Sequence, residues 1–80
     1  MEKEYYDFLF EEIEDKFNGQ ELHILCFFLG LRWDDLDGVG KRIKIKRLLA
    51  ILEQQGRIDE LAWQASRRFP DVPWREGRNN

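Results

Sequence analysis

Three acidic residues stand close together in the middle of the chain: Asp34, Asp35 and Asp37. Carboxylates grouped in this way can bind a metal ion or perform acid and base chemistry. A calcium-binding loop, however, needs a bidentate glutamate near its end, and the spacing here does not provide one. With no histidine partner in the loop, we interpret these three residues as capping and solvation of a turn.

The stretch Gly38-Val39-Gly40-Lys41 is similar to a fragment of a phosphate-binding loop. It lacks the full GxxxxGK[ST] spacing, and no strand precedes it, so the backbone cradle that binds phosphate is not expected. We interpret the stretch as a flexible turn.

Histidine and cysteine each occur once, as His23 and Cys26. A single histidine leaves any acid/base pair without its commonest member, and a single cysteine forms neither an internal disulfide nor a zinc-binding cluster. Both lie on a mainly apolar segment, where Cys26 is expected to be a small buried hydrophobic residue. The sequence therefore predicts no enzyme, with no catalytic residues, no metal site and no cofactor.

The overall composition describes one small domain of 80 residues with a net charge of −3. The longest apolar stretch, Ile24 to Leu29, is too short to cross a membrane, and the N-terminus does not resemble a signal peptide, so we expect a cytoplasmic protein. The charge is uneven: residues 1–21 carry eight acidic and two basic side chains, a balance of −6, and the rest of the chain has a balance of +3.

The elements that would position these residues are all helical. Apolar residues recur at helical spacing, and no segment alternates as a strand would. We expect helices at Glu2–Phe17, at Gln20–Leu29, at Lys41–Gln55 and from the Arg57-Ile58-Asp59 junction to Phe69, with a short turn or helix at Trp33–Leu36. These form a compact antiparallel bundle.

Each long helix carries a stripe of residues that we expect in the core. The stripes are Tyr6, Leu9, Phe10, Ile13 and Phe17; Ile45, Leu48, Leu49, Ile51 and Leu52; and Ile58, Leu61, Ala62, Ala65 and Phe69. The segment Gln20–Leu29 is apolar on nearly all sides, which predicts a helix at the buried centre of the domain.

Residues with special backbone preferences mark where the helices end. Asn18-Gly19, Gly30 and Gly56 are expected to stop the first three, since these residues tolerate the left-handed conformation. Asp59 can cap the last helix or lie in its first turn. Pro70 and Pro73 end it, and Trp74 to Asn80 is expected to be a loose tail or the start of a linker.

Several residues on the faces opposite the core are candidates for a protein interface. An aromatic residue among outward acids suggests a partner surface on the first helix, and exposed aromatic residues and arginines are common interface anchors. The candidate set is Glu4, Phe8, Glu11 and Asp15 on the first helix, Ile43, Lys46 and Arg47 on the helix 41–55, and Trp63 and Arg67 on the last helix.

The basic segment 41–47 allows three interpretations. It is a solvated helix face, a contact for nucleic-acid phosphates, or a cationic surface that docks on an acidic first helix of another molecule. The last interpretation fits the uneven charge best, and it permits head-to-tail contacts between copies. A small nucleic-acid-binding domain that uses residues 41–47 is the alternative function, although the negative net charge makes nucleic acid the weaker partner.

The order of several short motifs resembles one family. The segment Glu21–Gly30 is similar to the ELxxLCFxLG segment of bacterial effector-associated domains, and Trp33–Leu36 to their short acidic-aromatic element. Lys41 and Lys44 with the leucines that follow resemble a KxxKxxxL-type helix, Gly56–Leu61 resembles the GRLxEL junction, and Arg68-Phe69-Pro70 stands near the closing R-x-P.

This resemblance implies a death-fold-like bundle of five to six helices in residues 1–70, followed by a tail or linker at 71–80. It implies a homotypic adaptor whose partner is another death-like domain, from its own kind or from a sibling effector such as a protease or a NACHT-type ATPase. Such domains are linked to bacterial immunity and programmed cell death. The resemblance allows a homo-oligomer, and no membrane partner is expected.

Overall fold

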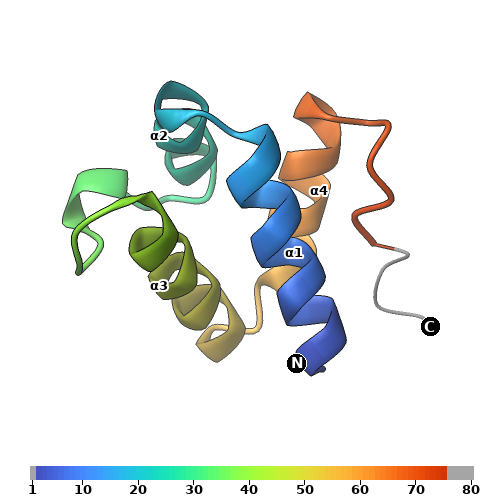
Figure 1. Cartoon of the computed structure of the whole chain (residues 1–80), viewed down its shortest axis with the longest axis horizontal. Coiled ribbons are helices and arrows are strands. Elements are labelled where there is room, and N and C mark those ends of the chain that lie inside the picture. The colour runs from blue at the N-terminus through green and yellow to red at the C-terminus, as the bar shows by residue number, and fades with distance from the viewer. Residues whose placement is uncertain (1, 76–80) are drawn as a thin grey trace.

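A computed structural model describes residues 2–75 of the chain. In this part of the chain every regular element is helical, and no strand occurs. The elements are α1 (Lys3–Lys16), α2 (Gly19–Phe28), the single-turn 3-10 helix η1 (Trp33–Asp35), α3 (Lys41–Gln54) and α4 (Ile58–Arg68). Helix α3 runs antiparallel to α1, α2 crosses one end of both, and α4 lies on the other side of α1 (Figure 1).

The expected all-helical class and the four long helices are confirmed, but the expected number of five to six helices is not matched. The fifth element, η1, is only three residues long: the backbone is already extended at Leu36, and Gly38 and Gly40 further on have positive φ angles of 109° and 94°. After α4, Pro70 and Pro73 allow only turns, so residues 70–75 form no sixth helix.

The start of α2 depends on Asn18, although not in the way the sequence suggested. Asn18 has a φ of −83°, so neither a left-handed Asn18 nor a left-handed Gly19 ends α1. Asn18 is instead the N-cap of α2: its side chain accepts the Glu21 N–H at 2.8 Å, and the Glu21 carboxylate accepts the Asn18 N–H at 2.9 Å. This reciprocal capping box turns the chain sharply between the two helices.

Glycines end the next two long helices, as expected. Gly30 and Gly56 have left-handed φ angles of 76° and 69°. After Gly56, the Arg57 N–H donates to the Leu52 carbonyl at 2.7 Å, which satisfies a free carbonyl at the end of α3. Asp59 is not the N-cap of α4. It lies in the first turn, where the positive end of the helix dipole stabilises its negative charge.

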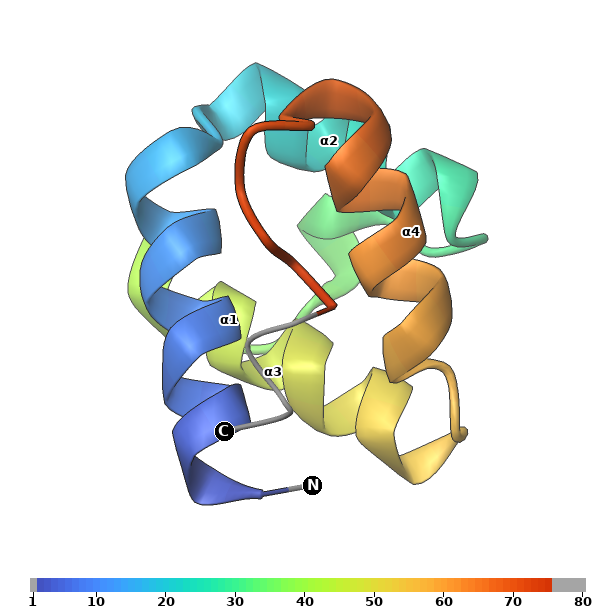
Figure 2. The ribbon, with the colours of Figure 1, turned by 90° about the vertical axis from the view of Figure 1, so that its right-hand side faces the viewer.

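The core follows the predicted stripes, except that Tyr6, Ile51 and Phe69 are only partly buried. On α1, Tyr5 is buried in place of Tyr6. The core also includes Trp74, which we expected in a loose tail but which is 1% exposed. The segment after α4 turns back and runs between α1 and α4 (Figure 2), so its tryptophan completes the core. The rest of the predicted tail, residues 76–80, lies outside the described residues.

Trp74 is held by specific contacts on both sides. Its indole N–H donates to the Phe69 carbonyl at 2.8 Å, and its ring meets Phe17 and Phe8 edge-on at centroid distances of 6.1 and 6.5 Å. Buried aromatic residues contribute large apolar areas to a core, and the indole N–H needs a partner. The short segment 69–75 is therefore part of the folded unit.

Candidate interaction surfaces

Helix α2 has two apolar faces, and only one of them is in the core. Leu22, Leu25, Cys26 and Leu29 face inward and are at most 4% exposed. Ile24, Phe27 and Phe28 face outward and are 49%, 76% and 59% exposed. The prediction that this helix is enclosed on all sides is therefore wrong. We call these three residues the outer face of α2.

A groove of about 470 Å³ lies between α2 and α4, beside this outer face. Its apolar wall contains Ile24, Leu25 and Phe28, and its floor includes Phe17. The polar rim consists of Asn18, Gln20 and Glu21 from the α2 side and Gln64, Arg67 and Arg68 from α4. An apolar hollow with a few charged groups at its edge is the usual form of a binding site.

One ion pair spans the two sides of this groove. The Arg68 guanidinium donates two hydrogen bonds to one carboxylate oxygen of Glu21, at 2.6 and 2.9 Å. The hydrogen bond from the Asn18 N–H and then the Arg68 pair lower the pKa of Glu21. Glu21 is therefore ionised near neutral pH, and it couples the capping of α2 to the position of α4.

The Arg67 guanidinium is the cation at the rim that has no carboxylate partner within residues 2–75. It lies over the Trp63 ring at 5.0 Å from the centroid, a cation–π arrangement. Trp63 itself is 49% exposed. The structure thus brings Arg67, a predicted interface residue, to a groove that the sequence did not reveal, and it places Trp63, a second predicted interface residue, against the Arg67 guanidinium.

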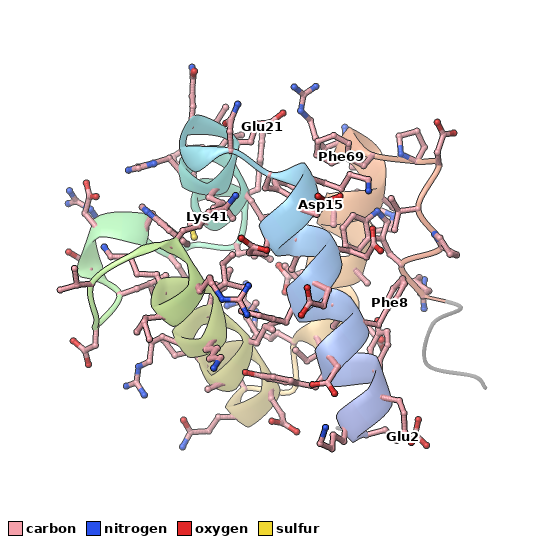
Figure 3. All side chains as sticks on the ribbon, in the orientation of Figure 1. Glu2, Phe8, Asp15, Glu21, Lys41 and Phe69 are labelled. Carbon is pink, nitrogen blue, oxygen red and sulfur yellow. The ribbon has the colours of Figure 1, made fainter. Side chains whose placement is uncertain are left out.

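The predicted interface residues on α1 and α3 lie on helices that already pack against each other. In Figure 3, Lys41 points toward α1, and its ammonium group donates to the Glu14 carbonyl at 2.7 Å. Arg42 pairs with the Glu14 carboxylate at 3.3 Å and lies over the Phe10 ring, as Lys46 also does. The acidic and basic helices therefore partly neutralise each other within one molecule.

The remaining predicted charges on these two helices are exposed. Glu4 and Glu11 are exposed on α1, and Asp15 pairs with the neighbouring Lys16 at 3.0 Å. Arg47 lies 3.9 Å from Asp37, near the limit of an ion pair. Exposed pairs of this kind contribute little to stability, so these side chains are available to a partner.

Phe8 is not the outward aromatic residue that the helical wheel suggested. Its ring stacks on Tyr5 at 6.4 Å and meets Trp74 edge-on, so it is partly covered by the segment that follows α4 (Figure 3). The placement failed because the sequence did not show that residues 69–75 fold back over α1. Packing accounts for Phe8, and we leave it out of the surfaces proposed below.

His23 and Cys26 are the residues on α2 whose side chains could carry chemistry, and both make structural contacts. The His23 ring bridges α2 to η1: Nδ1 donates to the Gly19 carbonyl at 2.8 Å, and Nε2 lies 3.3 Å from Asp34. The Gly19 bond, and then Asp34, raise the pKa of His23. Burial raises the pKa of the Cys26 thiol to about 11, which makes it a poor nucleophile.

Within residues 2–75, no three or more His, Cys, Asp or Glu side chains are grouped so that they could hold a metal ion. Asp34, Asp35 and Asp37 are separately exposed and each lies beside a cation or His23. Within the same range, no helix is both long and apolar enough to span a bilayer.

One signal in the sequence could have revealed the outer face of α2. A small domain buries a limited share of its surface, and four helices cannot cover every side of one of them. An all-round apolar helix in such a short chain therefore has to expose one side. The pattern Gln20, Ile24, Phe27 and Phe28 has the i, i+4, i+7, i+8 spacing of a single helical stripe.

These features define a small helical domain with apolar and charged surfaces and an inert thiol. Residues 8–70 match effector-associated domain 7, and the chain belongs to this family. Domains of this kind are accessory rather than catalytic parts of effector proteins. The comparisons with curated proteins and with solved structures gave no match.

Proposed function

We propose that this domain is a non-catalytic adaptor that associates with a second death-like domain, either its own copy or that of a sibling effector protein. The association would recruit or cluster the effector in a bacterial immunity or cell-death system. The observation that carries the proposal is the outer face of α2, where Ile24, Phe27 and Phe28 are exposed together.

The physical reason is the cost of leaving this face in water. Burial of apolar surface is favourable by about 25 cal/mol per Å². Contiguous exposed apolar patches are uncommon on monomers and mark interaction sites. The neighbouring Trp63 and Arg67 add residue types that frequently anchor protein interfaces.

Family membership supports the accessory role, and the all-helical bundle is compatible with a death-like fold. Homotypic association, the effector partner and the defence role are our proposals. A cytoplasmic setting is part of the same proposal. A free cysteine such as Cys26 persists in a reducing compartment, and the effector proteases or ATPases would act in that compartment.

The test is self-association of the 80-residue chain, measured by sedimentation velocity over a concentration series at low and moderate salt. We expect concentration-dependent association that the double variant Phe27→Ser/Phe28→Ser weakens strongly, with the far-UV circular dichroism of the folded chain retained. If the chain stays monomeric at high concentration and binds no sibling domain encoded beside it, the proposal is wrong.

The variant Arg47→Glu provides the contrast, because the sequence alone favoured the basic face of α3. A loss of association in Arg47→Glu, together with normal association of the double variant, would move the interface from α2 to α3. Titration of labelled duplex DNA and single-stranded RNA into the same chain tests the alternative, nucleic-acid binding through residues 41–47.

A further inference from the structure

The loop between η1 and α3 presents one apolar side chain almost completely to solvent. Val39 is 91% exposed, more than any other large hydrophobic residue that the structure describes. It stands between Gly38 and Gly40, which both have left-handed φ angles. A valine held at the tip of a loop in this way contributes nothing to the core.

The loop behind Val39 is packed and not loosely attached. A Cβ atom at Gly38 would lie 2.3 Å from the Cγ2 atom of Ile43, so the backbone approaches this side chain as closely as glycine allows. Ile43, a predicted interface residue, thus supports the loop from the first turn of α3. This close packing anchors the loop next to Val39.

Three acidic side chains precede this apolar tip in the same connecting segment, and each lies beside His23 or an arginine. The side chains of Asp34, Asp35 and Asp37 are 71%, 73% and 87% exposed. Asp35 and Asp37 lie 3.8 and 3.9 Å from arginines, at distances where the ion pairs are weak and easily exchanged. We call Val39 with these three acids the acidic knob.

The groove between α2 and α4 has the opposite character. Ile24, Leu25 and Phe28 form its apolar wall, and the guanidinium groups of Arg67 and Arg68 stand at its rim. Arg68 is occupied by Glu21, whereas Arg67 has no carboxylate partner in the described part of the chain. An apolar side chain flanked by carboxylates matches this groove in both polarity and charge.

Within residues 2–75, the exposed large hydrophobic residues outside α2 and α4 are Val39 and its supporting neighbour Ile43. Helix α1 exposes charges but no large apolar side chain. An apolar contact that joins the groove to a different surface of a second copy therefore comes from the loop 36–40 and the start of α3.

We propose that the groove between α2 and α4 of one molecule receives the acidic knob of a second copy. The knob and α4 lie on opposite sides of α2 along the long axis of the molecule (Figure 1), so neither contact blocks the other. Such a contact joins different surfaces, and unless its rotation closes a ring it adds further copies head to tail. This inference rests on the proposed homotypic association and names its two surfaces.

The test uses two variants that each remove one surface. Val39→Glu places a like charge among the knob acids, and Phe28→Ser removes an apolar wall of the groove. Each variant alone should lower the apparent association constant by roughly tenfold or more. The control Ala50→Glu makes the same kind of change at another exposed position, on α3, and should associate as the parent chain does.

Mixing the two variants gives the decisive measurement. In an equimolar mixture, the intact knob of Phe28→Ser meets the intact groove of Val39→Glu, so a heterodimer should form that does not grow further. Sedimentation velocity with one variant fluorescently labelled detects it. A contact between identical surfaces would show no such recovery, and that result would overturn the proposal.

Charge-reversal variants on the two surfaces provide a second test of the same contact. Arg67→Glu should weaken association, and mixing it with Asp37→Arg should restore part of it across the contact.

Outcomes for this contact and for the proposed function are separable. A parent chain that neither self-associates nor binds a sibling removes both. A parent chain that associates as strongly as its Val39→Glu variant removes only the knob-and-groove contact and leaves the outer face of α2 as the interface.

Discussion

The two faces of α2 use the same kinds of residue for different purposes. Leu22, Leu25, Cys26 and the C-cap residue Leu29 are enclosed by the other helices, whereas Ile24, Phe27 and Phe28 are exposed on the far side of the helix. Hydrophobicity alone does not distinguish them. The inner face holds the domain together, and the outer face is available to join it to another molecule.

The largest expected effect is a difference in the free energy of unfolding between substitutions on the inner face and on the outer face of α2. Leu22 is completely buried, so Leu22→Ala should lower the free energy of unfolding by about 2–5 kcal/mol through lost burial and a cavity. The matched change Ile24→Ala, two residues away on the outer face, should cost less than about 1 kcal/mol. Urea unfolding followed by circular dichroism measures both. Equal losses would contradict the division.

The next prediction concerns the thiol of the inner face. The pKa of Cys26 is about 11 rather than the ordinary 9.0, so at pH 8 the thiolate fraction should be about 100-fold lower than in the unfolded chain. Burial should slow modification further. The measurement is the rate of reaction with an aromatic disulfide reagent, with and without denaturant. Rapid modification of the folded domain would show that the inner face opens readily.

A third prediction divides the outer face itself. Phe28 lines the groove and Phe27 does not, so Phe28→Ser should weaken self-association more than Phe27→Ser. Both changes affect exposed side chains and should alter the free energy of unfolding by less than about 1 kcal/mol. Sedimentation velocity compares the two variants at equal concentration. A stronger effect of Phe27→Ser would place the contact on the solvent side of α2, away from α4.

The smallest expected effect is a pH dependence of the free energy of unfolding, and it comes from Glu21 at the start of α2. The pKa of Glu21 is lowered by the Asn18 N–H and Arg68, so its contribution is present above the unfolded pKa of 4.5 and is lost as pH falls through the folded pKa. Glu21→Gln should therefore flatten the loss of stability in acid, measured by urea unfolding between about pH 3 and 6. Glu11→Gln is the control, since Glu11 is exposed and forms no ion pair within the described residues.

Local rules predicted most of the helix boundaries. Gly30 and Gly56 end helices because only glycine adopts their left-handed backbone without strain, and the apolar stripe of α3 follows from helical periodicity. The family resemblance, carried by motif order over most of the chain, is confirmed by the match at residues 8–70.

The predictions about surfaces were weaker, because exposure depends on distant segments. Phe8 is covered by Trp74, which follows it by more than sixty residues, and the charges of Arg42 and Glu14 meet only because α1 and α3 pack together. The interface role of the exposed charges on α1 and α3 stays a prediction. Trp63 and Arg67 were selected as outward residues, but their position beside a groove depends on α2.

The sequence by itself determined an all-helical domain, because apolar periodicity and the glycine stops are properties of neighbouring residues. The apolar residues on nearly all sides of Gln20–Leu29 were a sign of surplus apolar surface, although we expected that helix to be enclosed. Only the tertiary structure decided which side of α2 is left in water, because four helices cover one another according to their packing, and Trp74 rather than a partner fills the space between α1 and α4. That choice leaves Ile24, Phe27 and Phe28, which we expected in the core, on the surface, where we propose that another molecule binds.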